Sequence, residues 1–243
     1  MPLVKMNPAF AHKNRIVRAD FQTKKRASKF LFHKLFSSRT IKNMAWNKYY
    51  IFVTNQEKTD FTDILPKLGL GAYKAVEETD LYSTNKPQTL FAGNLNGCLL
   101  LIHQDLVFKF YEVEQSETER RFIECFPNSE IAVLYSNETV YGFGYTIIQN
   151  GKRVRVNSGS DGELYYSFGE SLPEEIAIFS QNIFQEEEIE EMREFEDLDE
   201  EEINQRIHFE ACWRVPMRLT IRYLGQRIDE IDGENLKIIR FEK

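Results

Sequence analysis

The residues from 129 to 168 constrain the fold most, because apolar and polar positions alternate there between closely spaced turn signals. Such alternation places the apolar side chains on one face of a strand. Asn150-Gly151 is the strongest turn signal, since both residues readily adopt the positive φ angles of a type I′ hairpin. The pattern predicts a four-stranded antiparallel meander with strands at 131–135, 141–148, 152–156 and 163–168.

Two arginines lie on the third strand of this meander. Arg153 and Arg155 are two residues apart, so they share the strand face opposite Val154 and Val156. Charged side chains on strands commonly face water and block edge pairing. We therefore expect both arginines to be solvated, and the alternative is that they form half of an anion site.

Before the meander, the sequence indicates a strand, a hairpin and a helix. Residues 46–54 are aromatic and β-branched, which is typical of a buried strand. An Asn-Gly pair in the segment 89–103 predicts a hairpin. Ser116 and Glu119 fit a capping box, in which each side chain satisfies the backbone N–H of the other residue.

After the meander, the pattern is helical. Asp199 and Glu202 form a second capping box, which predicts a helix beginning there. Pro216 is expected to interrupt or kink that helix, and Gly225 to end it in a left-handed conformation. Residues 236–241 fit a closing strand.

Together these patterns predict one α+β domain over residues 44–243, an antiparallel sheet with helices packed on one face and a helical C-terminal region.

Residues 1–43 differ in charge from the rest of the chain. They contain eleven Lys and Arg and the single acid Asp20, so their net charge is +10, and the remaining residues carry −17. Basic blocks usually lie outside a packed core, so we expect a disordered arm, or upstream sequence that is not native if translation begins at Met44. A native arm would act as a transit peptide or would attach nucleic acid or an anionic membrane.

The usual motifs of enzyme chemistry do not occur in this sequence. It has no phosphate-binding loop, dinucleotide fingerprint, nucleophile elbow or zinc-protease helix. The weak catalytic candidates are His103, and Asp161 and Glu163 in the glycine-rich turn 158–163. His208 and Cys212 share a helix face at metal-ligand spacing, which makes them a weak metal pair. Ordinary core and turn roles explain all five residues, so we expect no cofactor and no metal.

Two segments, GYTIIQNGKRVRVNSGSDGELYYSFGESLPEE (144–175) and RLTIRYLGQRIDEID (218–232), resemble an uncharacterised bacterial family, a domain of unknown function. The resemblance covers residues 44–243 and implies a bacterial cytoplasmic protein, but it brings no activity and no catalytic residue. The odd count of three cysteines also suits a reducing compartment. No apolar run is long enough to cross a bilayer, so we expect no transmembrane segment.

Residues 186–202 contain twelve acids and one base, with apolar residues recurring every three positions. This pattern predicts a solvated helix with one apolar stripe. We expect a non-enzymatic binding or regulatory module that meets a basic protein partner through these acids, because charge complementarity speeds association. The alternatives are a hydrolase or transferase with a site near 158–163, and attachment through the arm 1–43. The expected partner-binding residues are Glu186, Glu187, Glu188, Glu190, Glu191 and Glu194.

Overall fold

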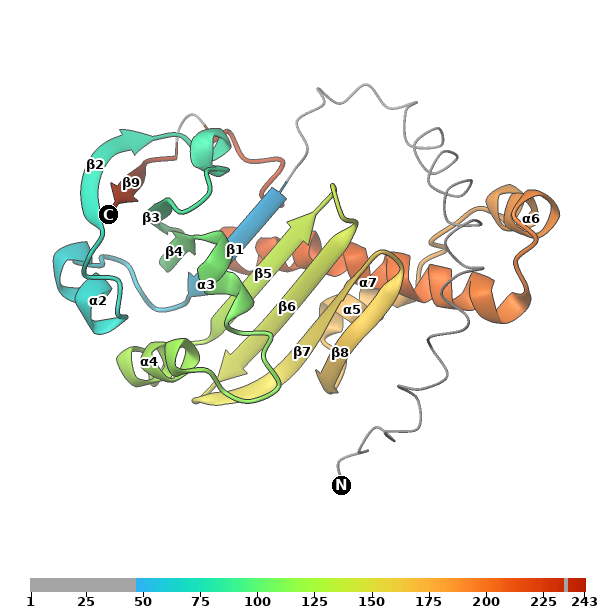
Figure 1. Cartoon of the computed structure of the whole chain (residues 1–243), viewed down its shortest axis with the longest axis horizontal. Helices are drawn as coiled ribbons and strands as arrows, with labels where there is room; N and C mark the ends of the chain where they lie inside the picture. The colour runs from blue at the N-terminus through green and yellow to red at the C-terminus, as the bar shows by residue number, and fades with distance from the viewer. Residues whose placement is uncertain (1–46, 234–235) are drawn as a thin grey trace. The chain divides into compact units, whose positions relative to one another are not determined.

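A computed structural model of the chain describes residues 47–233 and 236–243. The chain divides into two units, Met1–Met44 and Ala45–Lys243, and the described residues belong to the second. They build one antiparallel sheet with the strand order β2-β9-β3-β4-β1-β5-β6-β7-β8 (Figure 1). Its strands are β1 (Asn47–Val53), β2 (Lys74–Thr79), β3 (Leu90–Leu95), β4 (Cys98–Ile102), β5 (Ile131–Asn137), β6 (Gly142–Gln149), β7 (Lys152–Ser160), β8 (Glu163–Gly169) and β9 (Ile238–Glu242).

The predicted meander is confirmed as β5, β6, β7 and β8, which pair in chain order. Asn150 and Gly151 have φ angles of 49° and 71°, as a type I′ turn requires. The turn between β7 and β8 is shorter than the sequence suggested. Only Asp161 and Gly162 lie outside the strands, with φ angles of 52° and 86°, so the segment 158–163 is the tip of a tight hairpin.

The closing strand β9 is confirmed, but its place in the sheet was not predicted. It lies between β2 and β3 and pairs antiparallel with both. Thr79 of β2 is paired with Ile238, about 160 residues later in the sequence. The end of the described chain is therefore built into the sheet rather than added at its edge.

Helices cover both faces of the sheet, which corrects the expectation that they pack on one. The long helix α7 and α5 contribute to the core that contains Phe52 and Tyr145, while α2, α3 and α4 cover the core that contains Ile51 and Val133 (Figure 1). Successive strand residues point to opposite faces, so one strand such as β1 supplies both cores. The helices are α2 (Phe61–Lys67), α3 (Gln104–Phe108), α4 (Glu117–Cys125), α5 (Pro173–Phe179), α6 (Glu186–Phe195) and α7 (Glu200–Leu224), with the short 3₁₀ helix η2 at Leu81–Thr84.

The helix α7 runs for 25 residues without a break at Pro216, so the predicted interruption is wrong, while the predicted kink stays a prediction. A proline removes one backbone hydrogen bond from a helix. Val215 and Leu219 flank it and are fully buried against the sheet, and their packing keeps the helix continuous. Both predicted ends are confirmed, because Asp199 forms its capping box with Glu202 and Gly225 adopts a φ of 77°. No helix in the described part of the chain is both long and apolar enough to cross a bilayer.

Candidate functional site

The arginines of β7 are not solvated, and they lie on opposite faces of the sheet. The pairing of β6 with β7 is irregular here, because Ile147 faces Arg155 and the next residue, Ile148, faces Arg153. Val154 is therefore an extra residue, a β-bulge, which reverses the side on which Arg153 points. Each guanidinium forms an ion pair with a glutamate that is fully buried, so the expectation that both arginines face water is wrong.

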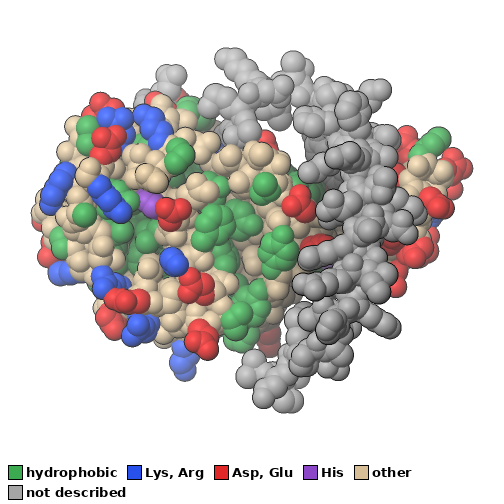
Figure 2. All heavy atoms as spheres, in the orientation of Figure 1, with side chains coloured by type: hydrophobic (Ala, Val, Ile, Leu, Met, Phe, Trp, Pro, Cys, Tyr) green, Lys and Arg blue, Asp and Glu red, His purple; other side chains and the backbone are tan. Residues whose placement is uncertain are grey.

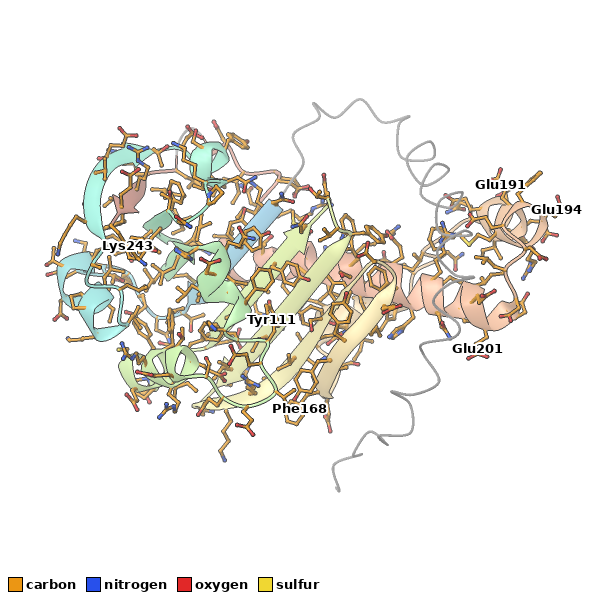
Figure 3. The ribbon with its side chains drawn as sticks, in the orientation of Figure 1. Tyr111, Phe168, Glu191, Glu194, Glu201 and Lys243 are labelled. Carbon is orange, nitrogen blue, oxygen red and sulfur yellow. The ribbon has the colours of Figure 1, made fainter. Side chains whose placement is uncertain are left out.

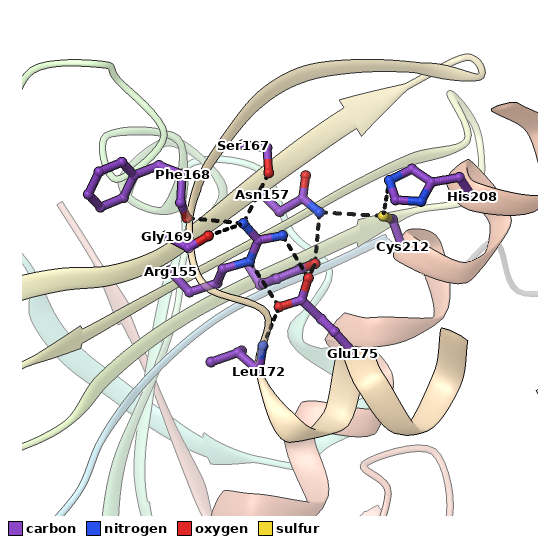
Figure 4. A network of polar contacts seen from close by, with 10 residues as sticks. Arg155, Asn157, Ser167, Phe168, Gly169, Leu172, Glu175, His208 and Cys212 are labelled. Carbon is purple, nitrogen blue, oxygen red and sulfur yellow. Dashed lines mark hydrogen bonds and ion pairs between the residues drawn. The ribbon is translucent and has the colours of Figure 1, made fainter. Parts of the chain in front are cut away.

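Arg155 pairs with Glu175 of α5 on the α7 side of the sheet (Figure 4). Its Nε and Nη2 donate to the two carboxylate oxygens at 2.9 and 2.7 Å, and the Tyr145 hydroxyl donates to Oε1 at 2.7 Å. Nη1 donates to the carbonyls of Phe168 and Gly169. Burial alone would lower the pKa of Arg155, but the hydrogen bonds with Glu175 outweigh it and raise the pKa. Arg155 therefore stays charged, and its pair with Glu175 fastens α5 to β6, β7 and β8.

The same network reaches the predicted metal pair. The Asn157 amide donates to the Tyr145 hydroxyl at 2.8 Å and to Cys212 Sγ at 3.4 Å, and His208 Nε2 lies 3.8 Å from that sulfur (Figure 4). The structure thus brings His208 and Cys212 together, as the spacing predicted. Burial raises the pKa of the Cys212 thiol to about 11, so it is a neutral, inaccessible thiol.

His103 does not join this pair. It caps α3 on the other side of the sheet, where its Nδ1 accepts from the Leu106 N–H and its Nε2 lies 2.7 Å from the Tyr73 hydroxyl. Because Nδ1 accepts, the neutral ring carries its proton on Nε2 and donates it to Tyr73. Burial lowers the pKa of His103, against the raising effect of Asp105. Both ring nitrogens are engaged, so proton transfer by His103 would first require one of these bonds to break.

A shallow pocket of about 230 Å³, much of it open to solvent, lies beside His103. Its lining includes Tyr49, Thr84, Lys86 and Gln104. The enclosed part holds about one water molecule.

Nowhere in residues 47–233 and 236–243 do three His, Cys, Asp or Glu side chains gather closely enough to hold a metal ion.

Asp161 and Glu163 are exposed at the β7–β8 turn. The Asp161 N–H donates to the carbonyls of Val140 and Tyr141, which ties the turn to the loop before β6. The structure does not bring His103 to this turn, because His103 lies beside Tyr73 at the start of α3. The residues of the turn thus have the geometry of a type I′ hairpin.

Arg153 pairs with Glu119 of α4 on the other face of the sheet. Its Nε donates to Glu119 Oε1 at 2.8 Å and its Nη2 pairs with Oε2, while Nη1 donates to the carbonyls of Glu112 and Val113. Ser116 caps α4 as expected, but the Glu119 carboxylate is used by Arg153. Of the predicted capping box, the structure therefore shows the bond from the Glu119 N–H to the Ser116 hydroxyl.

The six predicted partner-binding glutamates lie along α6 and are exposed. We call them the acidic surface: Glu186, Glu187, Glu188, Glu190, Glu191 and Glu194. Glu188 accepts from the Gln185 N–H at 2.7 Å, and Glu190 pairs with Arg193 at 2.8 Å. Among the described residues, Glu190 is the one member that forms an ion pair, and the other five form none. Acidic side chains gather at this end of the protein in Figure 2, and Figure 3 shows Glu191 and Glu194 on the outer side of α6.

The hydrophobic contacts of α6 are few. Met192 is buried, whereas Phe195, in the last turn, is 75% exposed. Exposed aromatic rings beside charged residues are common in protein interfaces, where the ring supplies apolar contact area. Sequence analysis found the acids but did not single out Phe195, although its place in the three-residue apolar repeat marked it as a helix-face residue.

Comparisons with known proteins give no further guide, since no protein-family model, curated protein or solved structure matches this chain. The proposed attachment through the arm 1–43 lies outside the described residues.

Proposed function

We propose that this protein is a non-enzymatic binding or regulatory module whose acidic surface meets a basic protein partner. The observation that carries the proposal is the combination on α6 of five exposed glutamates without an ion pair among the described residues and the exposed ring of Phe195. Uncompensated charge raises the rate of encounter with a partner of opposite sign, and an aromatic ring supplies the contact that holds it.

The geometry of the catalytic candidates supports binding over the alternative of a hydrolase or transferase. Cys212, which was predicted as a metal ligand, supplies no nucleophile, because a nucleophilic cysteine needs an accessible thiolate and Cys212 is buried with its pKa raised to about 11. His103 has both ring nitrogens engaged in hydrogen bonds.

The thiols of Cys98, Cys125 and Cys212 are all free, which supports a reducing, cytoplasmic location.

Charge reversal on one side of α6 tests the proposal. Glu187, Glu191 and Glu194 are spaced so that they share a helix face, and each is exposed. We expect the full wild-type chain to capture basic host proteins in a salt-sensitive way and the triple variant E187K/E191K/E194K to lose that capture. A defined lysine-rich peptide, titrated in low and moderate salt, should bind the variant at least about tenfold more weakly.

A matched control separates local from overall charge. The variant E57K/E114K/E124K changes three exposed glutamates outside α6 and shifts the net charge of the chain by the same amount. It should bind like the wild type if the acidic surface is the site. Equal losses in the two variants would contradict the proposal, because net charge alone would then explain the binding.

A further inference from the structure

Among the described residues the sheet ends at β8, and the side chains of this edge strand are exposed along almost its whole length. Every residue of β8 except the half-buried Tyr166 is exposed. Three of them are large and apolar: Leu164 is 40% exposed, Tyr165 is 60% and Phe168 is 45%. An edge strand presents unpaired backbone N–H and C=O groups, and apolar side chains beside them favour the addition of another strand.

The opposite edge of the same sheet is protected. Three of the six residues of β2 are charged, namely Lys74, Glu77 and Glu78, and the two glutamates pair with Arg240 and Lys237. Such charges oppose the addition of a strand. In β8 the only charged residue is Glu163, at its beginning. Each edge has one irregularity in its pairing, so the difference between the edges lies in their side chains.

The charges around β8 indicate what kind of strand fits. Asp161 precedes it, Glu163 begins it and Glu170 follows it, so an apolar centre lies between acids at both ends. Antiparallel pairing of two copies about Tyr166 would place Glu163 of each beside Gly169 and Glu170 of the other. The two glutamates would lie one position apart along the ladder rather than directly opposite, and their mutual repulsion at both ends of the ladder disfavours a second copy. The complementary occupant is a segment with apolar residues in its centre and Lys or Arg at its ends.

The C-terminal half of β8 is held in place before any partner arrives. The carbonyls of Phe168 and Gly169 accept from Arg155, whose other donors grip Glu175. A Cβ atom on Gly169 would lie only 2.0 Å from the Val154 carbonyl oxygen, so this close approach of the two strands requires glycine. Figure 4 shows the Phe168 ring pointing away from the buried network. A strand fixed in this way loses less conformational entropy on binding.

We infer that the β8 edge binds an extended segment of a partner protein, apolar in its centre and basic at its ends, by adding it as a further strand of the sheet. Main-chain hydrogen bonds then supply the affinity, and the exposed side chains of β8 together with Glu163 and Glu170 supply the specificity. The residues of this edge are separate from the acidic surface of α6, and the inference goes beyond the proposed function without resting on it.

Hydrogen exchange of the full chain tests the inference directly. The probe is a capped peptide of alternating valine and threonine with a pair of lysines at each end, and its control carries glutamates in place of the lysines. We expect the lysine peptide to slow amide exchange within residues 163–169 by about tenfold at saturation and to leave β2 unchanged. Equal protection by the glutamate peptide, or no protection of β8, would overturn the inference.

Two single substitutions then locate the contact. Phe168→Lys adds an edge-protecting charge to β8, and Val76→Lys makes the same kind of change on β2, where Val76 is 49% exposed. Both variants should melt close to the wild type, and only Phe168→Lys should weaken binding of the lysine peptide, by about tenfold. If Val76→Lys weakens it equally, the β8 edge is not the site. Concentration-dependent protection of β8 without peptide, with a dimer in sedimentation, would assign the edge to a second copy instead.

The valine–threonine peptide with lysine ends can also be titrated against E187K/E191K/E194K. If this variant loses binding and Phe168→Lys does not, the peptide binds α6, which would contradict the inference about β8. Loss in Phe168→Lys alone leaves the β8 edge as the site and gives no support to the acidic surface. The two proposals therefore fail under different outcomes.

Discussion

The two arginines of β7 make the same kind of ion pair in two different settings. Arg155 is tied to side chains from α5, β6 and β8, and through Asn157 to α7. Arg153 donates hydrogen bonds to one carboxylate on α4 and to two backbone carbonyls of the loop before that helix. The first pair joins five elements, whereas the second fastens a loop and one helix. We infer that the two glutamates, although equally buried, do not contribute equally to the free energy of unfolding.

The largest effect is expected from removing Glu175. Glu175→Gln would leave the Arg155 guanidinium, only 8% exposed, without its counter-charge. Breaking a buried pair from one side typically costs about 3–5 kcal/mol. Urea unfolding at neutral pH should show this loss. The double variant R155M/E175L should be more stable than E175Q, because no buried charge then remains, and a double variant less stable than E175Q would contradict that reason.

A smaller effect is expected from removing Glu119. Arg153 in Glu119→Gln would keep its bonds to the carbonyls of Glu112 and Val113, and it is slightly more exposed, at 11%. We expect a loss of about 1–3 kcal/mol in the same urea measurement. A loss equal to that of Glu175→Gln would remove the distinction between the two settings.

The rate at which the Cys212 thiol reacts should also distinguish the Arg155–Glu175 pair from the Arg153–Glu119 pair. Burial and a pKa of about 11 keep this thiol neutral at pH 8, so labelling by a disulfide reagent should be slow. Because Asn157 links Cys212 to Tyr145 and Glu175, Glu175→Gln should speed its labelling about tenfold through local opening. Glu119→Gln should leave the rate unchanged, and mass spectrometry of labelled peptides would separate Cys212 from Cys98 and Cys125.

The contribution of Cys212 to stability changes with pH in a defined direction. The folded pKa of Cys212 lies above its ordinary value of 9.0, so the neutral thiol is favoured by folding. Its contribution to stability is fully present below pH 9 and is lost as the pH rises towards about 11. Cys212→Ala should flatten the decline of stability in that window, measured by urea unfolding at pH 9 and above. An unchanged slope would show that the thiol does not titrate in this range.

The smallest effect on stability is expected at the acidic surface. E187K/E191K/E194K changes side chains that are exposed and form no ion pair among the described residues. Its free energy of unfolding, measured in urea, should stay within about 0.5 kcal/mol of the wild type, since surface substitutions rarely do more. A larger loss would mean that these acids support the fold, and that any change in binding has a structural cause.

The features that sequence predicted are those fixed by a few neighbouring residues. The Asn150-Gly151 turn, the Asp199 cap and the Gly225 end depend on local backbone chemistry, and the structure confirms each. The α+β class follows from the same local signals, because alternating strands and capped helices can be recognised one at a time.

The features that sequence missed depend on distant residues. The bulge at Val154 is visible only once β6 and β7 are paired, and it decides on which face Arg153 points. Glu175 lies 20 residues from Arg155, and nothing in its local pattern names that partner. Pro216 has the local signal of a helix break, but its buried neighbours outweigh it. The candidate site shows the same division, since the acids of α6 were predictable and the open β8 edge required the strand order.

The place of β9 between β2 and β3 has a consequence for the newly made chain. Within the described sheet β2 has β9 as its single neighbour, and β9 leaves the ribosome about 160 residues after β2. At about 5–20 residues per second, β2 therefore waits roughly 8–32 s for its partner. The strands β1 and β4 to β8 have all their neighbours much sooner, whereas β3 pairs early with β4 and waits for β9 on its other side. The β8 end of the sheet can thus pair as its strands are made, while the β2 end depends on β9, the last of the described strands.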